Sequence, residues 1–420
     1  MSAHDGTAAA DTGTGTTTTT QTSDLVTLII TTSPTPSAPS TDLISDILAS
    51  FKSHCPALLS CRVIVVLDTY DRVGPHMRLK KGQITAEGAR AVEQYKRNVK
   101  DLILREWCPC PHIADASSQS QGSEEQVFVR GESLAEYGSP HLAENHVTLA
   151  TLRTANGRVT FIEPAGRLGF GLAVRSALRA AETPLVWVQQ HDWPLVRAIP
   201  LRSLVAIMQA SEAGDGGGAD GRPPVKYVCL PAVRMLSYAT SAHVMPFPAL
   251  RALTAELKRD FVVPAPTSTS TSTSTSAPDD GVVPLTPLFF WHDKPHLAST
   301  AHYLARVFPS RLALARGDFI EDTVGQRARA QMKDGNWAKW ACWLYCPADG
   351  RVACLQHRHG RRWRGVEADA RSRALFEGEK EGIRRGEQIA QEKLSSKIDK
   401  YDSEGLDGEE GEGELGLGIE

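Results

Sequence analysis

Strands that are apolar throughout alternate with amphipathic helices along this chain of 420 residues. Leu25–Thr32, Val63–Leu67 and Leu185–Gln189 are apolar or β-branched runs of strand length. Between them, Ser40–Ser53 and Leu168–Ala181 carry apolar residues at the spacing of one helix face. A strand without a polar face must be covered on both sides. The alternation therefore predicts an α/β fold with a mostly parallel sheet and helices on both faces. Further predicted elements are helices at 85–107 and 201–209, and strands at 146–152, 159–162, 226–230 and 351–355.

A single ordered domain, residues 25–364, is expected between two segments that cannot bury a core. Residues 1–24 are a Thr-rich leader, and residues 365–420 combine a charged helix with an acidic, Gly-rich tail. The leader and the tail are predicted to be disordered, because such compositions bury too little apolar surface to fold. Low-complexity stretches near 212–224 and 264–282 are expected to be surface loops inserted into the domain.

The composition argues against a nucleic-acid-binding protein and against a membrane-spanning protein. The 46 Lys and Arg against 49 Asp and Glu give a net charge of -3, whereas a nucleic-acid-binding chain is usually strongly basic. We therefore expect no nucleic-acid partner. No run approaches the roughly 20 apolar residues that span a bilayer, and no signal peptide is evident. These features predict a cytoplasmic protein without a membrane span, whose eight cysteines stay reduced.

Polar residues follow the apolar strands directly. Ser33 lies in the turn after the first strand, Asp68 and Asp71 follow the second, and His191 and Asp192 follow the third. Ligands of such sheets bind at the carboxyl ends of the strands. Carboxylates gathered there suit a divalent cation that bridges phosphates. The alternative, that these Asp side chains only cap the following helices, stays open.

As a set, these features resemble a known family. Residues 25–71 and 166–193 are similar to the nucleotide-binding half of a GT-A glycosyltransferase of the family-two type. The first segment has an apolar strand, a polar turn, a helix and a second strand that ends in Asp. The second segment has a Gly-containing helix that leads to a strand ending in an acidic motif. The resemblance implies that Asp68 or Asp71 contacts the nucleotide and that Asp192 ligates a metal. Ser33 and Arg167 belong to the same expected donor site.

The acidic motif departs from the family. Gln190-His191-Asp192 stands where Asp-x-Asp is usual, so one carboxylate is missing. His191 offers a nitrogen ligand, which Mn²⁺ tolerates better than Mg²⁺. The departure equally fits weak metal use or a protein without catalysis.

Two clusters in the C-terminal half add candidate residues. Phe289–His296 mixes aromatic residues with Lys294, which suits a sugar or phosphate site or a capped strand end. Glu321 and Asp322 lie at the start of a helix predicted to run to about Lys333. The resemblance implies that one of the two is the general base that deprotonates the acceptor hydroxyl. Helix capping alone is the alternative for both.

A third cluster, His357–Arg364, is strongly basic. In the resembled family a late His completes the metal site and a basic residue near it holds the diphosphate, roles that His359 (or His357) and Arg361 would fill. A zinc site, contact with RNA or an acidic partner, and a solvated basic turn remain as alternatives.

The leading hypothesis is thus an inverting glycosyltransferase that uses a nucleotide-diphospho-sugar donor, an acceptor that the sequence does not identify, and a divalent cation, Mn²⁺ or Mg²⁺. The alternatives are a non-catalytic GT-A-like protein that binds a nucleotide or partner, and a metal-dependent nucleotidyltransferase or hydrolase. One feature discriminates them: the glycosyltransferase requires that Asp192, Glu321 and His359 converge on one crevice.

Overall fold

The computed structural model describes residues 21–109, 128–213, 223–263 and 281–371, and residues 374, 385 and 388. The chain divides into two compact units, Met1–Arg362 and Trp363–Glu420. Most of the predicted leader, both low-complexity insertions and the acidic tail lie outside the described residues. In the second unit, residues 366–371 are helical. The fold that follows is that of the first unit.

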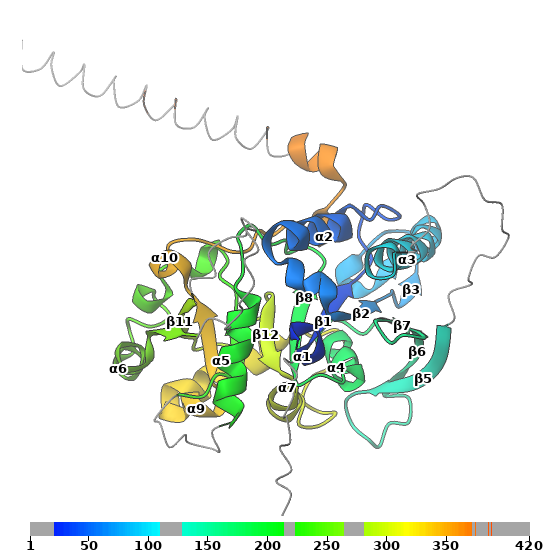
Figure 1. Ribbon diagram of the computed structural model, residues 1–420. Coiled ribbons are helices and arrows are strands. Elements are labelled where there is room, and N and C mark those ends of the chain that lie inside the picture. Colours follow the sequence, from blue (N-terminus) through cyan, green and yellow to red (C-terminus); the bar gives the residue numbers. More distant parts are fainter. Residues whose placement is uncertain are drawn as a thin grey trace, which may run out of the picture. The chain divides into compact units, whose positions relative to one another are not determined.

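The first unit consists of strands and helices that alternate over most of its length (Figure 1). The strands are β1 (Val26–Thr32), β2 (Arg62–Leu67), β3 (Arg72–Val73), β4 (Gln83–Ile84), β5 (Phe128–Glu136), β6 (His146–Thr154), β7 (Val159–Pro164), β8 (Leu185–Gln190), β9 (Tyr227–Cys229), β10 (Arg259–Val262), β11 (Val282–Pro287), β12 (His296–Ser299) and β13 (Cys342–Tyr345). The helices are α1 (Thr22–Leu25), α2 (Asp42–His54), α3 (Ala86–Trp107), α4 (Phe170–Ala180), α5 (Leu201–Ala213), α6 (Pro248–Leu257), α7 (Thr300–Arg306), α8 (Gln326–Gln331), α9 (Trp337–Trp340) and α10 (Pro347–Gly350).

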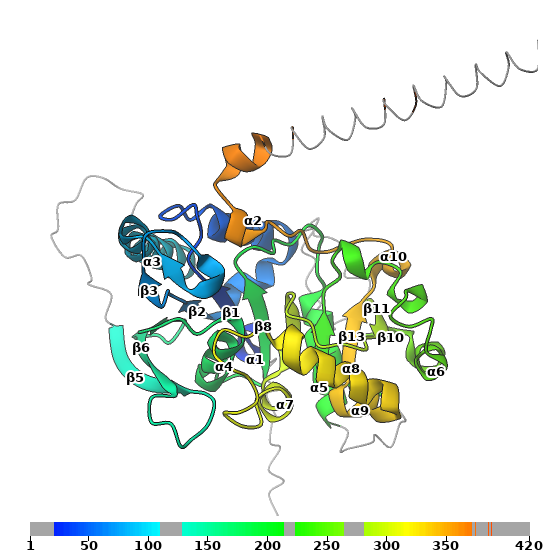
Figure 2. The same ribbon diagram turned by 180° about the vertical axis from the view of Figure 1, so that it is seen from behind.

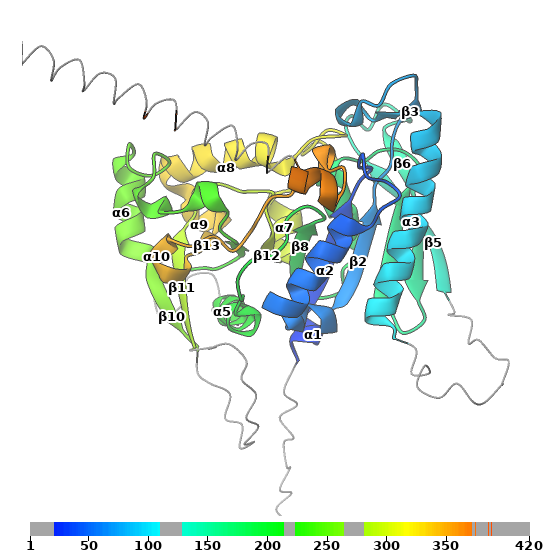
Figure 3. The ribbon, with the colours of Figure 1, turned by 90° about the horizontal axis from the view of Figure 1, so that it is seen from above.

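Within the described residues, eleven of the strands form one sheet, in the order β10-β11-β13-β9-β12-β8-β1-β2-β7-β6-β5. β7, β2, β1 and β8 run parallel, and β13 pairs with β9 in parallel. β12 lies between β8 and β9 and is antiparallel to both. Figure 3 shows β5 and β10 at opposite ends of this sheet. The sheet is therefore mixed but mostly parallel at its centre.

Helices cover both faces of the central strands. Figures 1 and 2 show α2 and α3 on one side, and α4 and α7 on the other. All seven residues of β1 are buried, as are the apolar residues of β2 and of β8. The α/β prediction is thus confirmed. Among the described residues, no helix is long and apolar enough to cross a membrane.

Several details differ from the sequence-based expectation. The segment 351–355 is a turn rather than a strand, and only Leu355 forms a bridge, to Leu195. The helix expected to run from Glu321 to Lys333 is instead interrupted. A π-helical turn spans Glu321–Gly325, and a second such turn, Met332–Asn336, ends the short helix α8 that follows. β5, β10, β11, β12 and β13 were not expected.

The register of the sheet places the ends of three strands side by side. Thr32 of β1 lies opposite Leu67 of β2, and Thr31 lies opposite Gln190 of β8. These strands are parallel, so the residues that follow them emerge at the same edge of the sheet. The antiparallel strand β12 begins at His296, opposite Val188, and so brings the loop before it to this edge too.

Candidate functional site

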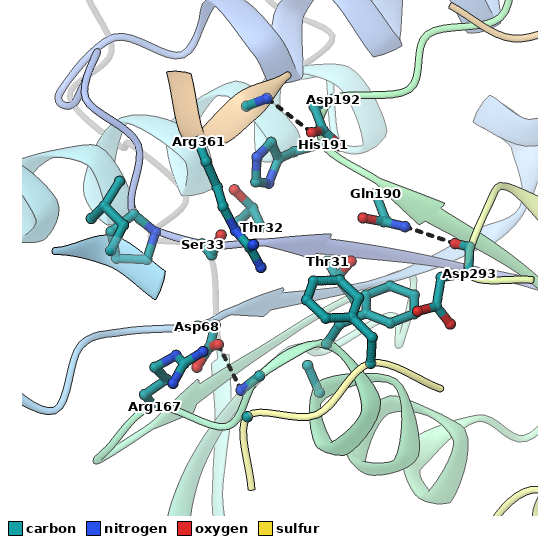
Figure 4. Close-up of a pocket in the computed structure, with 18 of the residues that line it drawn as sticks. Thr31, Thr32, Ser33, Asp68, Arg167, Gln190, His191, Asp192, Asp293 and Arg361 are labelled. Carbon is teal, nitrogen blue, oxygen red and sulfur yellow. Dashed lines mark hydrogen bonds between the residues drawn. The ribbon is translucent and has the colours of Figure 1, made fainter. Parts of the chain in front are cut away.

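One pocket opens at this edge of the sheet, with a cavity volume of about 530 Å³ (Figure 4). Its walls come from the ends of β1, β2 and β8 and from five other segments, around residues 82, 170, 293, 320 and 360. Ten of the sequence-predicted site residues line it; Asp71 does not. Those ten are Ser33, Asp68, Arg167, His191, Asp192, Lys294, Glu321, Asp322, His359 and Arg361.

Asp68 is buried and binds the segment just before α4. Its carboxylate oxygens accept hydrogen bonds from the backbone N–H groups of Leu168 (2.7 Å) and Gly169 (3.0 Å), and from that of Thr69 (2.9 Å). Burial raises the pKa of Asp68, and the three N–H groups work against that rise. Asp68 therefore holds the chain segment that leads into α4, about a hundred residues further along the chain. Asp71, outside the pocket, pairs with Arg316.

Asp192 holds a turn of the C-terminal segment against the pocket. Its Oδ2 accepts a hydrogen bond from the backbone N–H of Gly360 (2.9 Å) and lies 3.2 Å from His357 Nε2. Trp193 stacks on the His357 ring, with centroids 4.3 Å apart and an interplanar angle of 8°. Burial disfavours the charged form of Asp192. The hydrogen bonds and the neighbouring histidines outweigh that penalty and lower its pKa to about 2. The carboxylate is ionised and already has partners.

The turn passes very close to His191. A Cβ atom added to Gly360 would lie 2.5 Å from His191 Nε2 and 3.1 Å from Asp192 Oδ2. The residue before it, His359, has a φ of +54°. His191 is buried, and its Nδ1 has no hydrogen-bond partner. Burial lowers the pKa of this imidazole, which favours the neutral ring. Any larger residue at position 360 would require the turn or the His191 imidazole to move.

These residues do not fit a protein-held cation. Asp192 uses one oxygen for Gly360 and His357, and Gln190 donates its amide N–H to the backbone carbonyl of Asp293 (2.7 Å). Over the described part of the chain, no three His, Cys, Asp or Glu side chains gather into a group that could hold a metal ion. The cation expected on Asp192, His191 and His359 stays a prediction that this arrangement does not support.

A second acidic group surrounds Glu321. Its Oε2 accepts a hydrogen bond from the backbone N–H of Asp293 (3.3 Å) and lies 3.3 Å from His292 Nδ1 and 3.4 Å from Lys294 Nζ. Burial opposes the charge of Glu321, but these neighbours lower its pKa to about 2. In return, Asp293 Oδ1 accepts from the Glu321 backbone N–H (3.2 Å). Glu321 is thus a fixed, ionised carboxylate, which makes it a weak base.

Asp322 and Asp293 have fewer partners than Glu321. Within the described residues, the Asp322 side chain lines the pocket and forms no hydrogen bond or ion pair. Asp293 is only 5% exposed, and its Oδ2 has no partner. Burial and the nearby Glu321 carboxylate raise the pKa of Asp293 well above its ordinary value. Of the two acids predicted as general base, Asp322 is the one with a free carboxylate.

Two arginines supply positive charge. Arg361 reaches from the C-terminal turn into the pocket, toward the side that carries Asp68 and Arg167 (Figure 4). Its guanidinium lies over the Phe319 ring, 5.0 Å from the centroid. Burial, and then the charge of Arg167, lower the pKa of Arg361. Among the described residues, neither guanidinium forms an ion pair. Two like charges brought together in a concave site attract an anion.

Sequence reasoning missed part of this site. The sequence pattern places Asp293 in the Phe289–His296 cluster but gives no reason to choose it as a site residue. The pattern gives no reason to choose Trp193 either. No local signal identifies Asp293, because its importance comes from the contact with Glu321, 28 residues away. His357 was the less favoured of two histidines, although it is the one that contacts Asp192.

Comparison with known proteins yields little. The sequence matches no protein-family model and no curated protein. Among solved structures, the chain is similar to the mannosyltransferase PcManGT from Pyrobaculum calidifontis in complex with GDP-Man and Mn2+, with a TM-score of 0.30 and 13% sequence identity. The match covers 78% of this chain and 58% of that one. The chain therefore spans less than two thirds of that protein, and its own activity is a matter for proposal.

Proposed function

We propose that the protein is a glycosyltransferase that takes its sugar from a nucleotide-diphospho-sugar. The observation that carries the proposal is a convergence. Asp192, Glu321 and His359 come from three distant segments, and all three line one pocket at the carboxyl ends of parallel strands. This is the feature that the glycosyltransferase hypothesis requires. The polar ends of β1, β2 and β8 on the same pocket support the finer proposal of a GT-A layout of the family-two type.

The pocket offers separate regions for the parts of such a donor. Ser33, Asp68 and Tyr70 line the pocket and suit the base and ribose, because hydroxyl groups donate and accept hydrogen bonds and a carboxylate accepts them. Arg167 and Arg361 suit the diphosphate, because each guanidinium group can donate two parallel hydrogen bonds to phosphate oxygens. A volume of about 530 Å³ lies within the range of ligand sites.

Asp322 is the proposed general base of an inverting transfer. The acceptor oxygen forms a bond to the anomeric carbon while the bond from that carbon to the diphosphate oxygen breaks. The acceptor proton passes to the Asp322 carboxylate, and the electron pair leaves with the nucleoside diphosphate. The arginine pair stabilises the charge that builds up on that leaving group. No step is assigned to a cation, since the donor set around Asp192 does not fit one.

Calorimetry with a panel of UDP- and GDP-sugars tests the donor site, and a transfer assay with the donor that binds tests the reaction. The matched variant is Asp322→Asn, which keeps the shape of the side chain and removes the base. We expect it to bind the donor like the parent chain and to lose at least about 100-fold in transfer rate. Donor binding without transfer by the parent chain would favour the non-catalytic protein. Hydrolysis or nucleotidyl transfer would favour the second alternative, and no binding would refute the donor site.

A further inference from the structure

We infer that the pocket holds the diphosphate with the arginine pair Arg167 and Arg361 in place of a divalent cation, and that Asp192 positions Arg361 instead of ligating a metal. This inference rests on the proposed function, because it assumes a nucleotide diphosphate in this pocket. It departs from what the family resemblance implies, and the departure follows from how the carboxylates of the pocket are used.

Three acids that line the pocket already bind other groups of the protein. Asp68 accepts hydrogen bonds from the backbone N–H groups of Leu168 and Gly169, just before α4, and from that of its neighbour Thr69. Asp192 binds Gly360 and His357, and Glu321 pairs with Lys294 and lies 3.3 Å from His292 Nδ1. A divalent cation at the diphosphate needs oxygen ligands from the protein as well as from the phosphates. In the resembled family, a second carboxylate stands at the position of Gln190. Here the side-chain amide of Gln190 donates a hydrogen bond to the backbone carbonyl of Asp293.

The charge that a cation would supply is present in another form. Arg167 and Arg361 point into the same pocket (Figure 4). Within the described residues neither guanidinium forms an ion pair, although the charges of Asp192 and Asp322 act on Arg361 from a greater distance. The charge of Arg167 acts against that of Arg361, and a diphosphate between the two guanidinium groups would relieve that repulsion. Each guanidinium can donate two parallel hydrogen bonds to phosphate oxygens. The pair therefore matches a diphosphate in charge and in donor geometry.

Asp192 fixes where Arg361 stands. The hydrogen bond from the Gly360 N–H to Asp192 Oδ2 (2.9 Å) pins the residue next to Arg361 in the chain. The Arg358 N–H donates to the Asp192 backbone carbonyl (2.8 Å), so both ends of the His359–Gly360 turn are attached to the same residue. An acid that would be a metal ligand in the resembled family here organises a cationic turn.

Binding of UDP and GDP by calorimetry, in excess EDTA and again in excess Mn²⁺, tests the inference. We expect affinities that differ by less than about 3-fold between the two conditions. Arg167→Gln and Arg361→Gln should each weaken binding by about 10-fold, because each removes charge-assisted hydrogen bonds. Arg179→Gln, on the exposed end of α4, removes the same charge outside the pocket and should leave the affinity unchanged.

Two Asp192 variants separate positioning from metal ligation. Asp192→Asn keeps an oxygen for the Gly360 N–H and should retain most of the binding, whereas Asp192→Ala should lose about 10-fold. Binding that appears only with Mn²⁺ and vanishes in Asp192→Asn would overturn the inference while leaving the proposed function intact. A folded protein that binds no UDP or GDP in either condition would overturn the inference, and the proposed function would then depend on whether the sugar-linked donors bind.

Discussion

Replacing Gly360 by Ala is the sharpest test of the turn that carries Arg361. The added Cβ would lie 2.5 Å from His191 Nε2, whereas an ordinary contact between such atoms is about 3.5 Å. The turn or the imidazole must therefore move by about 1 Å. Asp192 Oδ2 at 3.1 Å blocks part of that movement. Overpacking of this size typically costs about 1–3 kcal/mol in unfolding free energy.

The larger effect should fall on binding. A shift of about 1 Å at Gly360 displaces Arg361 and lengthens its hydrogen bonds to a phosphate, so we expect UDP or GDP to bind about 10-fold more weakly. Urea unfolding and calorimetry measure the two effects separately. Gly131→Ala in β5 is the matched control, because a Cβ there would lie 4.0 Å from its nearest neighbour, Thr151. Unchanged nucleotide affinity in Gly360→Ala, with a folded protein, would refute the argument that this turn positions Arg361.

Three further predictions concern stability and are checked by urea unfolding. The pKa of Asp192 is lowered from 3.8 to about 2 in the folded state. The stability that this carboxylate contributes is therefore present above pH 3.8 and is lost as the pH falls toward 2. The loss in unfolding free energy should amount to about 2 kcal/mol and should be absent in Asp192→Asn. Asp68→Ala leaves three N–H groups without their acceptor and should cost about 2 kcal/mol or more, whereas Thr41→Ala, at an N-cap whose side chain makes no capping bond, should change little. Trp187→Ala empties a fully buried position in β8 and should cost about 3–5 kcal/mol, and a loss below 1 kcal/mol would contradict the packing described.

The centre of the fold could be predicted because its signal is local. β1 and β8 are continuous apolar runs, and α4 has apolar residues at helical spacing, so pattern and structure agree within one or two residues. The unexpected strands lack that signal. β11 contains Pro284 and Pro287, which argue against a strand, and β12 is a short segment that begins with a buried His296.

The segment 351–355 shows the opposite error. Its apolar residues suggest a strand, but the segment forms a turn in which Cys354 and Leu355 are buried, and its one strand-like pairing is the bridge from Leu355 to Leu195. Apolar residues in a short segment indicate burial without specifying the backbone that achieves it.

For the candidate site, the sequence predicted which residues gather but not what they do to one another. The ends of β1, β2 and β8 had to meet in a parallel sheet, which placed Ser33, Asp68 and Asp192 at one edge. Gly360 binds Asp192 by a hydrogen bond, and Lys294 pairs with Glu321. Both contacts depend on loops, and no local sequence pattern predicts the paths of these loops. The expected roles of these acids therefore needed the structure.

The bond between Gly360 and Asp192 joins residues 168 positions apart in the chain. β1 and β8 pair across a similar length of chain, but they do so through a ladder of backbone bonds between buried strands, whereas Gly360 is held to Asp192 by a single bond at the pocket. We therefore expect the turn at Gly360 to open more easily than the central strands. In native-state hydrogen exchange, the Gly360 amide should open at a lower free energy than the amides of β1. A nucleotide that needs the turn in place should slow exchange at Gly360 far more than at β1, which would make this amide a reporter of pocket occupancy.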